Sequence, residues 1–194
     1  MKLDLNYYTR VYDNFLEPEF CDSLVQKYEK TWATEQEKIK ELSLCANCSL
    51  CTCERIDIMQ HKEFDEYWEY SARKFQSAID RYKTDVQLDP VQFPREFAFE
   101  HIKIKRYMPN TEDQFRTHVD VEDHASAKRF LVFLVYLNDN FEQGETTFPI
   151  FGDQVKPVKG RLLMFPPTWT YLHRGEKVYG NNPKYILGSY LTYV

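Results

Sequence analysis

The sequence lacks any apolar run that approaches the roughly 20 residues needed by a membrane-spanning helix. It also lacks internal repeats, Pro/Gly-rich linkers and low-complexity tracts, so no segment marks a boundary between domains. Its opening, Met1–Asn6, contains no apolar segment of the kind found in signal peptides. From these absences we expect a single domain over residues 1–194, located in the cytoplasm and without a membrane partner.

Basic residues are the minority charge, since 25 Lys and Arg stand against 30 Asp and Glu, giving a formal net charge of −5. Proteins that bind nucleic acids neutralise phosphates with cations, so this balance argues against nucleic acid as a partner. Aromatic residues are abundant, with 14 Tyr, 14 Phe and 3 Trp. Such a chain can form a packed core, which excludes intrinsic disorder.

Cysteine is scarce outside one segment, which contains Cys45, Cys48, Cys51 and Cys53. Cysteines this close together cannot cross-link distant parts of a fold, which argues against a secreted disulfide framework. Four thiols do have the ligand type and number of a tetrahedral zinc site. Zinc sites normally draw their ligand pairs from separated segments, so we favour reduced thiols without metal and keep zinc binding as the alternative.

The first half of the chain has mainly helical patterns. One helix is expected to open at Glu17–Phe20, where Pro18 suits a first turn and apolar residues then recur every four. A second helix is expected from Glu63 to Tyr82, because its apolar side chains form one continuous stripe. The cysteine segment lies between the two helices, and a short candidate strand, Arg55–Ile58, follows it.

The second half has the patterns of β-strands. Residues alternate in polarity from Phe97 to Tyr107, and Phe130–Leu137 is apolar throughout, as in a strand buried on both faces. Shorter strands are expected at Thr146–Phe148, Arg161–Phe165 and Lys184–Tyr193. Short strands separated by Gly and Pro turn signals are typical of a sandwich or jelly roll.

Together these elements predict an α+β fold. Residues 95–194 would form the jelly-roll core, and residues 1–94 would supply helical support and the cysteine-rich loop. Helices packed against the outer face of one sheet would explain why a strand of that sheet is apolar on both sides.

The segment Phe115–Asp120 carries the most chemical information. Residues two apart in a strand point to the same side, so His118 and Asp120 direct an imidazole and a carboxylate toward one point. His173 follows another apolar strand. Two histidines and one carboxylate form the facial triad of non-haem Fe(II) oxygenases, which makes these three residues our candidate metal ligands and catalytic residues.

Two further basic residues are candidates for contact with a ligand. Lys184 shares a strand face with Ile186 and Tyr190, and an inward lysine is costly to desolvate unless an anion pairs with it. No acid in the sequence is an evident partner, so a ligand carboxylate is one candidate and a surface position is the alternative. Arg55 is a candidate for contact with substrate, with a structural salt bridge as the alternative.

The order of these motifs resembles that of the Fe(II)/2-oxoglutarate dioxygenases, in particular the prolyl 4-hydroxylase-like branch. The resemblance rests on Tyr107, His118-Val119-Asp120, Arg129–Leu137, Gly144–Pro149, Lys159–Phe165, His173 and Lys184-Tyr185. The N-terminal segment Asn14–Val25 also resembles the leading strand and helix of that family.

The resemblance implies a double-stranded β-helix and a set of ligands. Fe(II) would be held by His118, Asp120 and His173, and 2-oxoglutarate would bind the iron with its far carboxylate on Lys184 and Tyr107. With O2, the reaction would yield a hydroxylated product, succinate and CO2, and ascorbate is a candidate reductant. The implied substrate is a proline-containing peptide or protein, and we expect a monomer or weak dimer.

Three positions depart from the prolyl hydroxylase pattern. Phe115 stands where a Tyr usually precedes the HxD motif, Val132 replaces a Thr, and Tyr190 stands where a Trp often lines the peptide groove. The iron and cosubstrate pattern is therefore intact, while the substrate pattern is altered.

Other functions stay open at this point. One is hydroxylation of a small molecule or free amino acid, and another is a non-catalytic jelly-roll or zinc-binding interaction domain. The complete triad argues against a decayed site. Nucleic-acid demethylation is disfavoured, because that branch generally has Arg after its distal His and this chain is acidic.

Overall fold

The computed structural model describes residues 5–43 and 53–194, and its largest feature is a seven-stranded sheet. This sheet has the order β1 (Arg10–Tyr12), β10 (Leu162–Phe165), β6 (Arg129–Tyr136), β13 (Lys184–Tyr193), β4 (Lys103–Tyr107) and β2 (Glu54–Asp57), with β3 (Phe97–Phe99) also paired to β13. A four-stranded sheet has the order β5 (Phe115–His118), β11 (His173–Gly175), β8 (Thr146–Phe148) and β9 (Asp153–Val155). A short pair joins β12 (Val178–Tyr179) to β7 (Glu142–Gln143). The jelly-roll prediction is confirmed.

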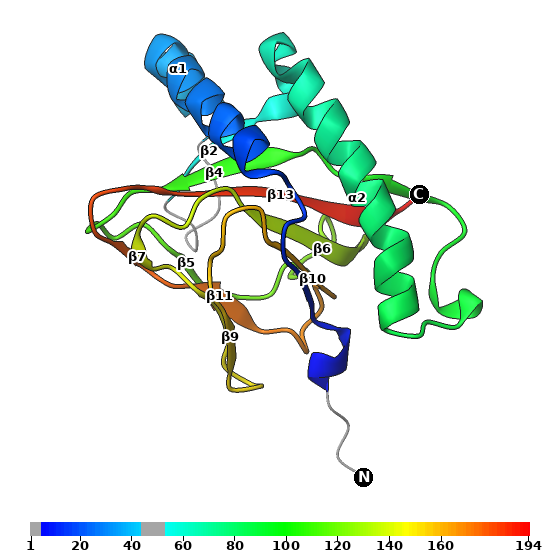
Figure 1. Ribbon diagram of the computed structural model, residues 1–194. Helices are drawn as coiled ribbons and strands as arrows, with labels where there is room; N and C mark the ends of the chain where they lie inside the picture. The colour runs from blue at the N-terminus through cyan, green and yellow to red at the C-terminus, as the bar shows by residue number, and fades with distance from the viewer. Residues whose placement is uncertain (1–4, 44–52) are drawn as a thin grey trace.

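Two long helices, α1 (Pro18–Ser43) and α2 (Asp65–Asp85), cover the outer face of the large sheet (Figure 1). The short 3-10 helices are η1 (Leu5–Tyr8), η2 (Ile58–Gln60), η3 (Lys62–Phe64) and η4 (Pro90–Gln92). Both predicted helices are therefore present, although α2 extends beyond its predicted end. No helix in the described ranges is long and apolar enough to cross a membrane.

Strand β6 is buried on both faces, as its sequence predicts. Leu131 and Phe133 belong to the core beneath the helices, where the Phe133 ring lies 4.9 Å from the ring of Phe75 in α2. Val132 and Tyr136, which alternate with them, belong to the separate apolar clusters on the opposite face. The helices thus fix one face of β6, and its other face is available for a site between the two sheets.

The expectation of one strand from Phe97 to Tyr107 is wrong, because the structure divides this segment into β3 and β4. Both pair with β13, but the ladder is interrupted between them, where the Ser189 hydroxyl donates to the carbonyl oxygen of Glu100 over 2.7 Å. Alternating polarity alone gave no sign of this interruption. The predicted strand Arg55–Ile58 is β2, displaced by one residue because Asp57 caps the following 3-10 helix.

Residues before position 95 contribute strands as well as helices, since β1 and β2 form the two edges of the large sheet. The division of the chain at residue 94 into helical support and jelly-roll core stays a prediction, as does the single-domain organisation of residues 1–194.

Gly160 joins the N-terminal segment to the turn before β10. Its carbonyl oxygen accepts hydrogen bonds from the backbone N–H groups of Phe15 and Leu16, over 2.9 and 3.1 Å. Its φ of +77° lies in the left-handed region, and a Cβ at this position would overlap the carbonyl oxygen of Leu16. Glycine is therefore required here for both conformation and space.

We predict that Gly160→Ala lowers the free energy of unfolding more than Gly152→Ala does. Gly152 has a similar φ of +73°, but a Cβ there has no heavy atom within 4 Å. In the control, Gly152→Ala, the free energy of unfolding should fall only by the cost of placing alanine in left-handed backbone, about 1–2 kcal/mol. Gly160→Ala should lose about 1–3 kcal/mol more through overpacking. Urea unfolding of both variants measures the difference, and equal losses would show that the contact with Leu16 is not constraining.

Candidate active site

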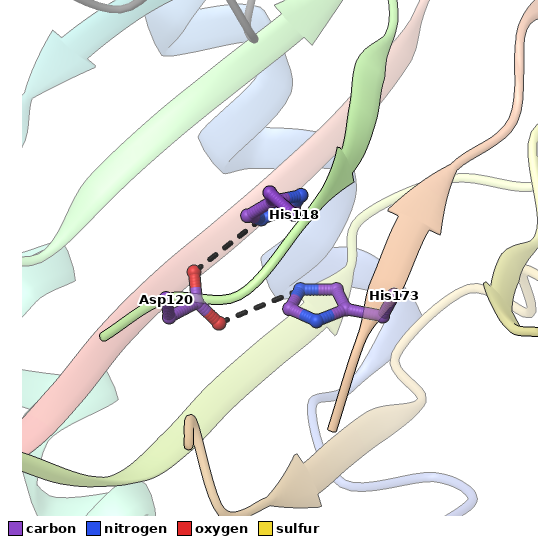
Figure 2. Close-up of side chains that lie close together, drawn as sticks. All are labelled: His118, Asp120 and His173. Carbon is purple, nitrogen blue, oxygen red and sulfur yellow. Dashed lines mark ion pairs between the residues drawn. The ribbon is translucent and has the colours of Figure 1, made fainter. Parts of the chain in front are cut away.

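The structure brings His118, Asp120 and His173, called the triad below, to one point between the two sheets (Figure 2). His118 ends β5 and His173 begins β11, and the two residues are direct partners in the antiparallel register. Asp120 follows His118 by two residues. One ligand atom from each side chain lies within 4.8 Å of the others, and no other group of three or more such residues occurs within the described part of the chain.

Both imidazoles are oriented by backbone carbonyls. Nδ1 of His118 lies 2.7 Å from the carbonyl oxygen of Arg116, and Nδ1 of His173 lies 2.9 Å from that of Tyr171. A carbonyl oxygen only accepts hydrogen bonds, so each Nδ1 carries the proton. Each Nε2 then presents a lone pair toward Asp120, at 3.5 Å from His118 and 3.4 Å from His173.

This arrangement fits a metal ion. Nε2 of His118 is buried and has no hydrogen-bond partner among the residues that the structure describes. Burial also lowers the pKa of His173, which favours its neutral form. Two neutral imidazole nitrogens and a carboxylate oxygen, each directed at one point, supply the donor set that a divalent transition metal takes.

Asp120 is held in place by residues of the large sheet. The hydroxyl of Tyr190 donates to Oδ1 of Asp120 over 2.7 Å, and Nη1 of Arg129 donates to its carbonyl oxygen over 3.0 Å. Arg129 also lies over the Tyr190 ring at 4.1 Å and is paired with Glu100 at 2.7 Å. Burial acts to raise the pKa of Asp120, but His173, His118 and the Tyr190 hydroxyl outweigh it and hold that pKa well below its usual range.

Lys184 is buried rather than on the surface, with only 1% of its area exposed. Its Nζ donates to the carbonyl oxygen of Gly144 over 2.6 Å and lies 5.3 and 5.7 Å from the rings of Tyr107 and Tyr136. It forms no ion pair within the described residues. Burial lowers the pKa of Lys184 to about 7, which the more distant charge of Glu145 only partly opposes.

A pocket between the sheets connects the triad to Lys184. Tyr107, which is the register partner of Lys184, lines it together with Phe115, Val132 and Tyr190. The predicted cosubstrate residues and all three departures from the prolyl hydroxylase pattern therefore face the same space as the triad.

Sequence reasoning missed the contacts that support the triad. Phe115 stacks on His118 with a ring-centre distance of 3.5 Å, while Tyr190 and Arg129 contact Asp120. Strand alternation places Tyr190 on the same face as Lys184, which was a usable signal that it faces the pocket. Its contact with Asp120 depends on how the two sheets stack, and no local pattern encodes that.

The cysteine segment lies mostly outside the described residues. This applies to Cys45, Cys48 and Cys51, whereas Cys53 is described and half-buried. Zinc binding by these four residues stays an open alternative to reduced thiols.

Comparison with known proteins places the site in a family. Residues 102–192, which include the triad and Lys184, match the family model of the 2OG-Fe(II) oxygenase superfamily. Over these residues the chain is similar to this superfamily. As a 2OG-Fe(II) oxygenase it is an oxidoreductase that uses Fe(II), 2-oxoglutarate and O2. No curated protein matches the sequence.

Solved structures similar to this oxygenase include three prolyl hydroxylases. The viral collagen prolyl hydroxylase of Paramecium Bursaria Chlorella virus-1 has 22% identity and a TM-score of 0.70, covering 96% of this chain and 97% of its own. The Pseudomonas putida prolyl-4-hydroxylase has 18% identity and a TM-score of 0.64, with coverage of 96% and 92%. A Trichoplax adhaerens prolyl hydroxylase, solved with a hypoxia inducible factor peptide, has 15% identity and a TM-score of 0.68, with coverage of 96% and 84%.

The depressed pKa of Lys184 predicts a pH dependence of stability. Between the folded pKa of about 7 and the ordinary value of 10.5, the unfolded chain binds a proton that the folded chain does not. Lys184 should therefore destabilise the fold fully below pH 7 and progressively less as the pH rises toward 10.5. This contributes a slope of up to about 1.4 kcal/mol per pH unit.

Lys184→Met should remove that slope while keeping most of the side-chain volume. The free energies of unfolding of wild type and variant are measured with urea at several pH values between 7 and 10. The contributions of other titrating groups cancel in the difference between the two proteins. The variant should be the more stable protein at pH 7, and the two curves should converge at high pH. Parallel curves would contradict the assignment.

Proposed function

We propose that this oxygenase hydroxylates prolyl residues of a peptide or protein. The observation that carries the proposal is that the likeness to prolyl hydroxylases extends over 96% of the chain, and so includes the N-terminal helices as well as the jelly roll. One of these relatives is named a collagen prolyl hydroxylase, and another was solved in complex with a peptide fragment of hypoxia inducible factor. The intact triad and pocket support a catalytic function for this chain.

In this proposal the triad holds Fe(II) through Nε2 of His118, Nε2 of His173 and a carboxylate oxygen of Asp120. The backbone carbonyls on the two Nδ1 atoms keep both rings in the metal-binding tautomer. Tyr190 and Arg129 keep the carboxylate ionised and oriented. Bound iron, together with 2-oxoglutarate, supplies the activation of O2 that converts 2-oxoglutarate to succinate and CO2 and inserts one oxygen atom into a substrate C–H bond.

Lys184 would bind the far carboxylate of 2-oxoglutarate, with Tyr107 beside it at the same end of the pocket. An incoming carboxylate favours the ammonium form of Lys184 and so offsets the burial that lowers its pKa. Phe115, Val132 and Ile186 line the space between this end and the triad, and their apolar surfaces limit the access of water. Ascorbate use and the monomeric or weakly dimeric state stay predictions.

The function is tested by incubating the enzyme with Fe(II), 2-oxoglutarate and proline-rich peptides, while succinate and peptide mass are measured. We expect succinate formation and a gain of one oxygen atom on proline. Asp120→Ala should abolish both while the protein remains folded, because the triad then lacks its only carboxylate. Glu142→Gln, a change at an exposed acid outside the pocket, is the matched control and should retain activity.

Two results would overturn the proposal in different ways. Oxidation of free amino acids alone, across a broad peptide panel, would indicate a small-molecule hydroxylase. Normal turnover by Asp120→Ala would show that the triad assignment is wrong.

A second prediction concerns Tyr190, whose hydroxyl contacts the candidate ligand Asp120. Tyr190→Phe keeps the ring and removes only the hydrogen bond. Loss of such a supporting partner typically weakens metal binding by about 10- to 100-fold. Anaerobic titration with Co(II), followed through its visible spectrum, measures this without turnover. Tyr179→Phe, on β12, is the control, and unchanged Co(II) affinity in Tyr190→Phe would refute the positioning role.

A further inference from the structure

A row of basic side chains lies along one side of the site. The proposed reaction assigns no role to them. Arg55 of β2 is directly opposite Lys105 of β4, and Lys103 is two residues before Lys105, so all three share one face. Arg106, which alternates with the two lysines, turns to the other face and pairs with Glu29 of α1. Arg55, Lys103 and Lys105 are called the basic wall below.

The basic wall borders the space beside the triad. All three of its residues line an open groove that also contains His118 and Asp120. Its two lysines additionally line the pocket that contains Lys184. The β13 partner of Lys103 is Gly188, which has no side chain to fill the space next to that lysine. A ligand at the triad therefore has room to extend a group to the basic wall.

The two lysines of the wall are not directly paired with an acid among the residues that the structure describes. Within the described part of the chain, neither Lys103 nor Lys105 forms an ion pair or a hydrogen bond with a carboxylate. Asp57, the register partner of Lys103, instead contacts Nδ1 of His101 at 2.7 Å. Burial lowers the pKa of Lys103, and the charge of Arg55 lowers it further, while the charges of Asp57 and Glu100 oppose this shift only in part. Like charges held together and partly desolvated are costly unless an anion joins them.

Lys105 lies close to the triad, with the ring of Phe115 between them. Its Nζ lies 4.6 Å from the ring centre of Phe115, and Phe115 stacks on His118 at 3.5 Å with an interplanar angle of 16°. One aromatic ring thus separates the cation from a candidate iron ligand. An anion bound to Lys105 would lie beside the reacting position rather than on it.

The basic wall is positively charged, whereas the chain as a whole has a formal net charge of −5. Glu122 and Asp123 also line the groove, but they are exposed, so solvent screens their charges more than those of the partly buried lysines. The groove therefore favours an anion specifically along the β2 and β4 side.

We propose that the basic wall binds a carboxylate of the substrate, so that the enzyme selects prolines with Asp or Glu one or two positions away. The inference rests on the proposed function, since it places a peptide at the triad. Successive residues of an extended peptide rise by about 3.3 Å, so a side chain one or two residues from the reacting proline spans the single ring between triad and wall.

The test compares peptides that are identical except for Asp, Asn or Lys next to the target proline. Because the bond to the Asp side chain is charge-assisted, kcat/KM for the Asp peptide should exceed that for the Asn peptide by roughly ten- to hundredfold. The Lys peptide should have the lowest kcat/KM of the three. In the double variant Lys103→Met/Lys105→Met the Asp-to-Asn ratio should fall toward one. Lys156→Met, a change at an exposed lysine outside the groove, is the matched control and should keep the wild-type ratio. Lys105→Glu should shift the preference toward the Lys peptide.

Peptide binding to the Mn(II)- and 2-oxoglutarate-loaded enzyme, measured by calorimetry, separates this inference from the proposed function. A preference for the Asp peptide that depends on the two lysines supports the basic wall even if no oxygen enters proline, in which case only the proposed function fails. Equal affinities for the three peptides, or no peptide binding, overturn the inference. A raised KM for 2-oxoglutarate in the double variant, with the peptide preference unchanged, also overturns it, because the wall would then serve the cosubstrate.

Discussion

The burial of β6 on both faces is the constraint on which the site depends. Phe133 and its neighbours under the helices hold one face, so the alternate residues, including Val132 and Leu134, form a fixed floor for the pocket. Strand β13 pairs with β6 along most of its length and extends that floor to Lys184 and Tyr190. Side chains on paired strands inside a packed layer have little freedom, which is what a preorganised site requires. The helices therefore act on the chemistry through the sheet, without contacting the pocket.

The triad belongs to the other sheet, and polar contacts join it to this floor. Asp120 follows β5, yet its carboxylate bonds to Tyr190 of β13 and its carbonyl oxygen bonds to Arg129 of β6. A buried carboxylate is costly unless its oxygens are satisfied, so the same contacts that orient Asp120 also offset its burial. The two sheets are thus tied together at the point where the candidate metal ligands meet. Loosening either sheet would be expected to alter the geometry of all three ligands.

Sequence patterns predicted the parts of this arrangement that are encoded locally. The apolar run identified β6 through strand periodicity, and the HxD spacing placed His118 and Asp120 together, although Asp120 lies just beyond the end of β5. The position of His173 opposite His118 was not available in this way, since strand register between distant segments is set by the whole fold. The interruption between β3 and β4 depends on Ser189 of another strand. Long-range contacts of this kind also explain why Tyr190 was predicted as a groove residue and not as a partner of Asp120.

The cations of the site differ in their exposure to water, and this difference separates their roles. Lys184 is almost fully buried, which lowers its pKa to about 7, and within the described residues its hydrogen bond is accepted by a backbone carbonyl. A carboxylate that reaches this lysine must leave water completely, which suits a small cosubstrate enclosed by the protein. Lys103 and Lys105 border the open groove and remain partly hydrated. A carboxylate there keeps part of its own hydration, which suits a side chain on a longer chain that continues into solvent. The proposed binding of 2-oxoglutarate at Lys184 and of a substrate carboxylate at Lys103 and Lys105 would therefore differ in depth, although these lysines lie on neighbouring strands of one sheet.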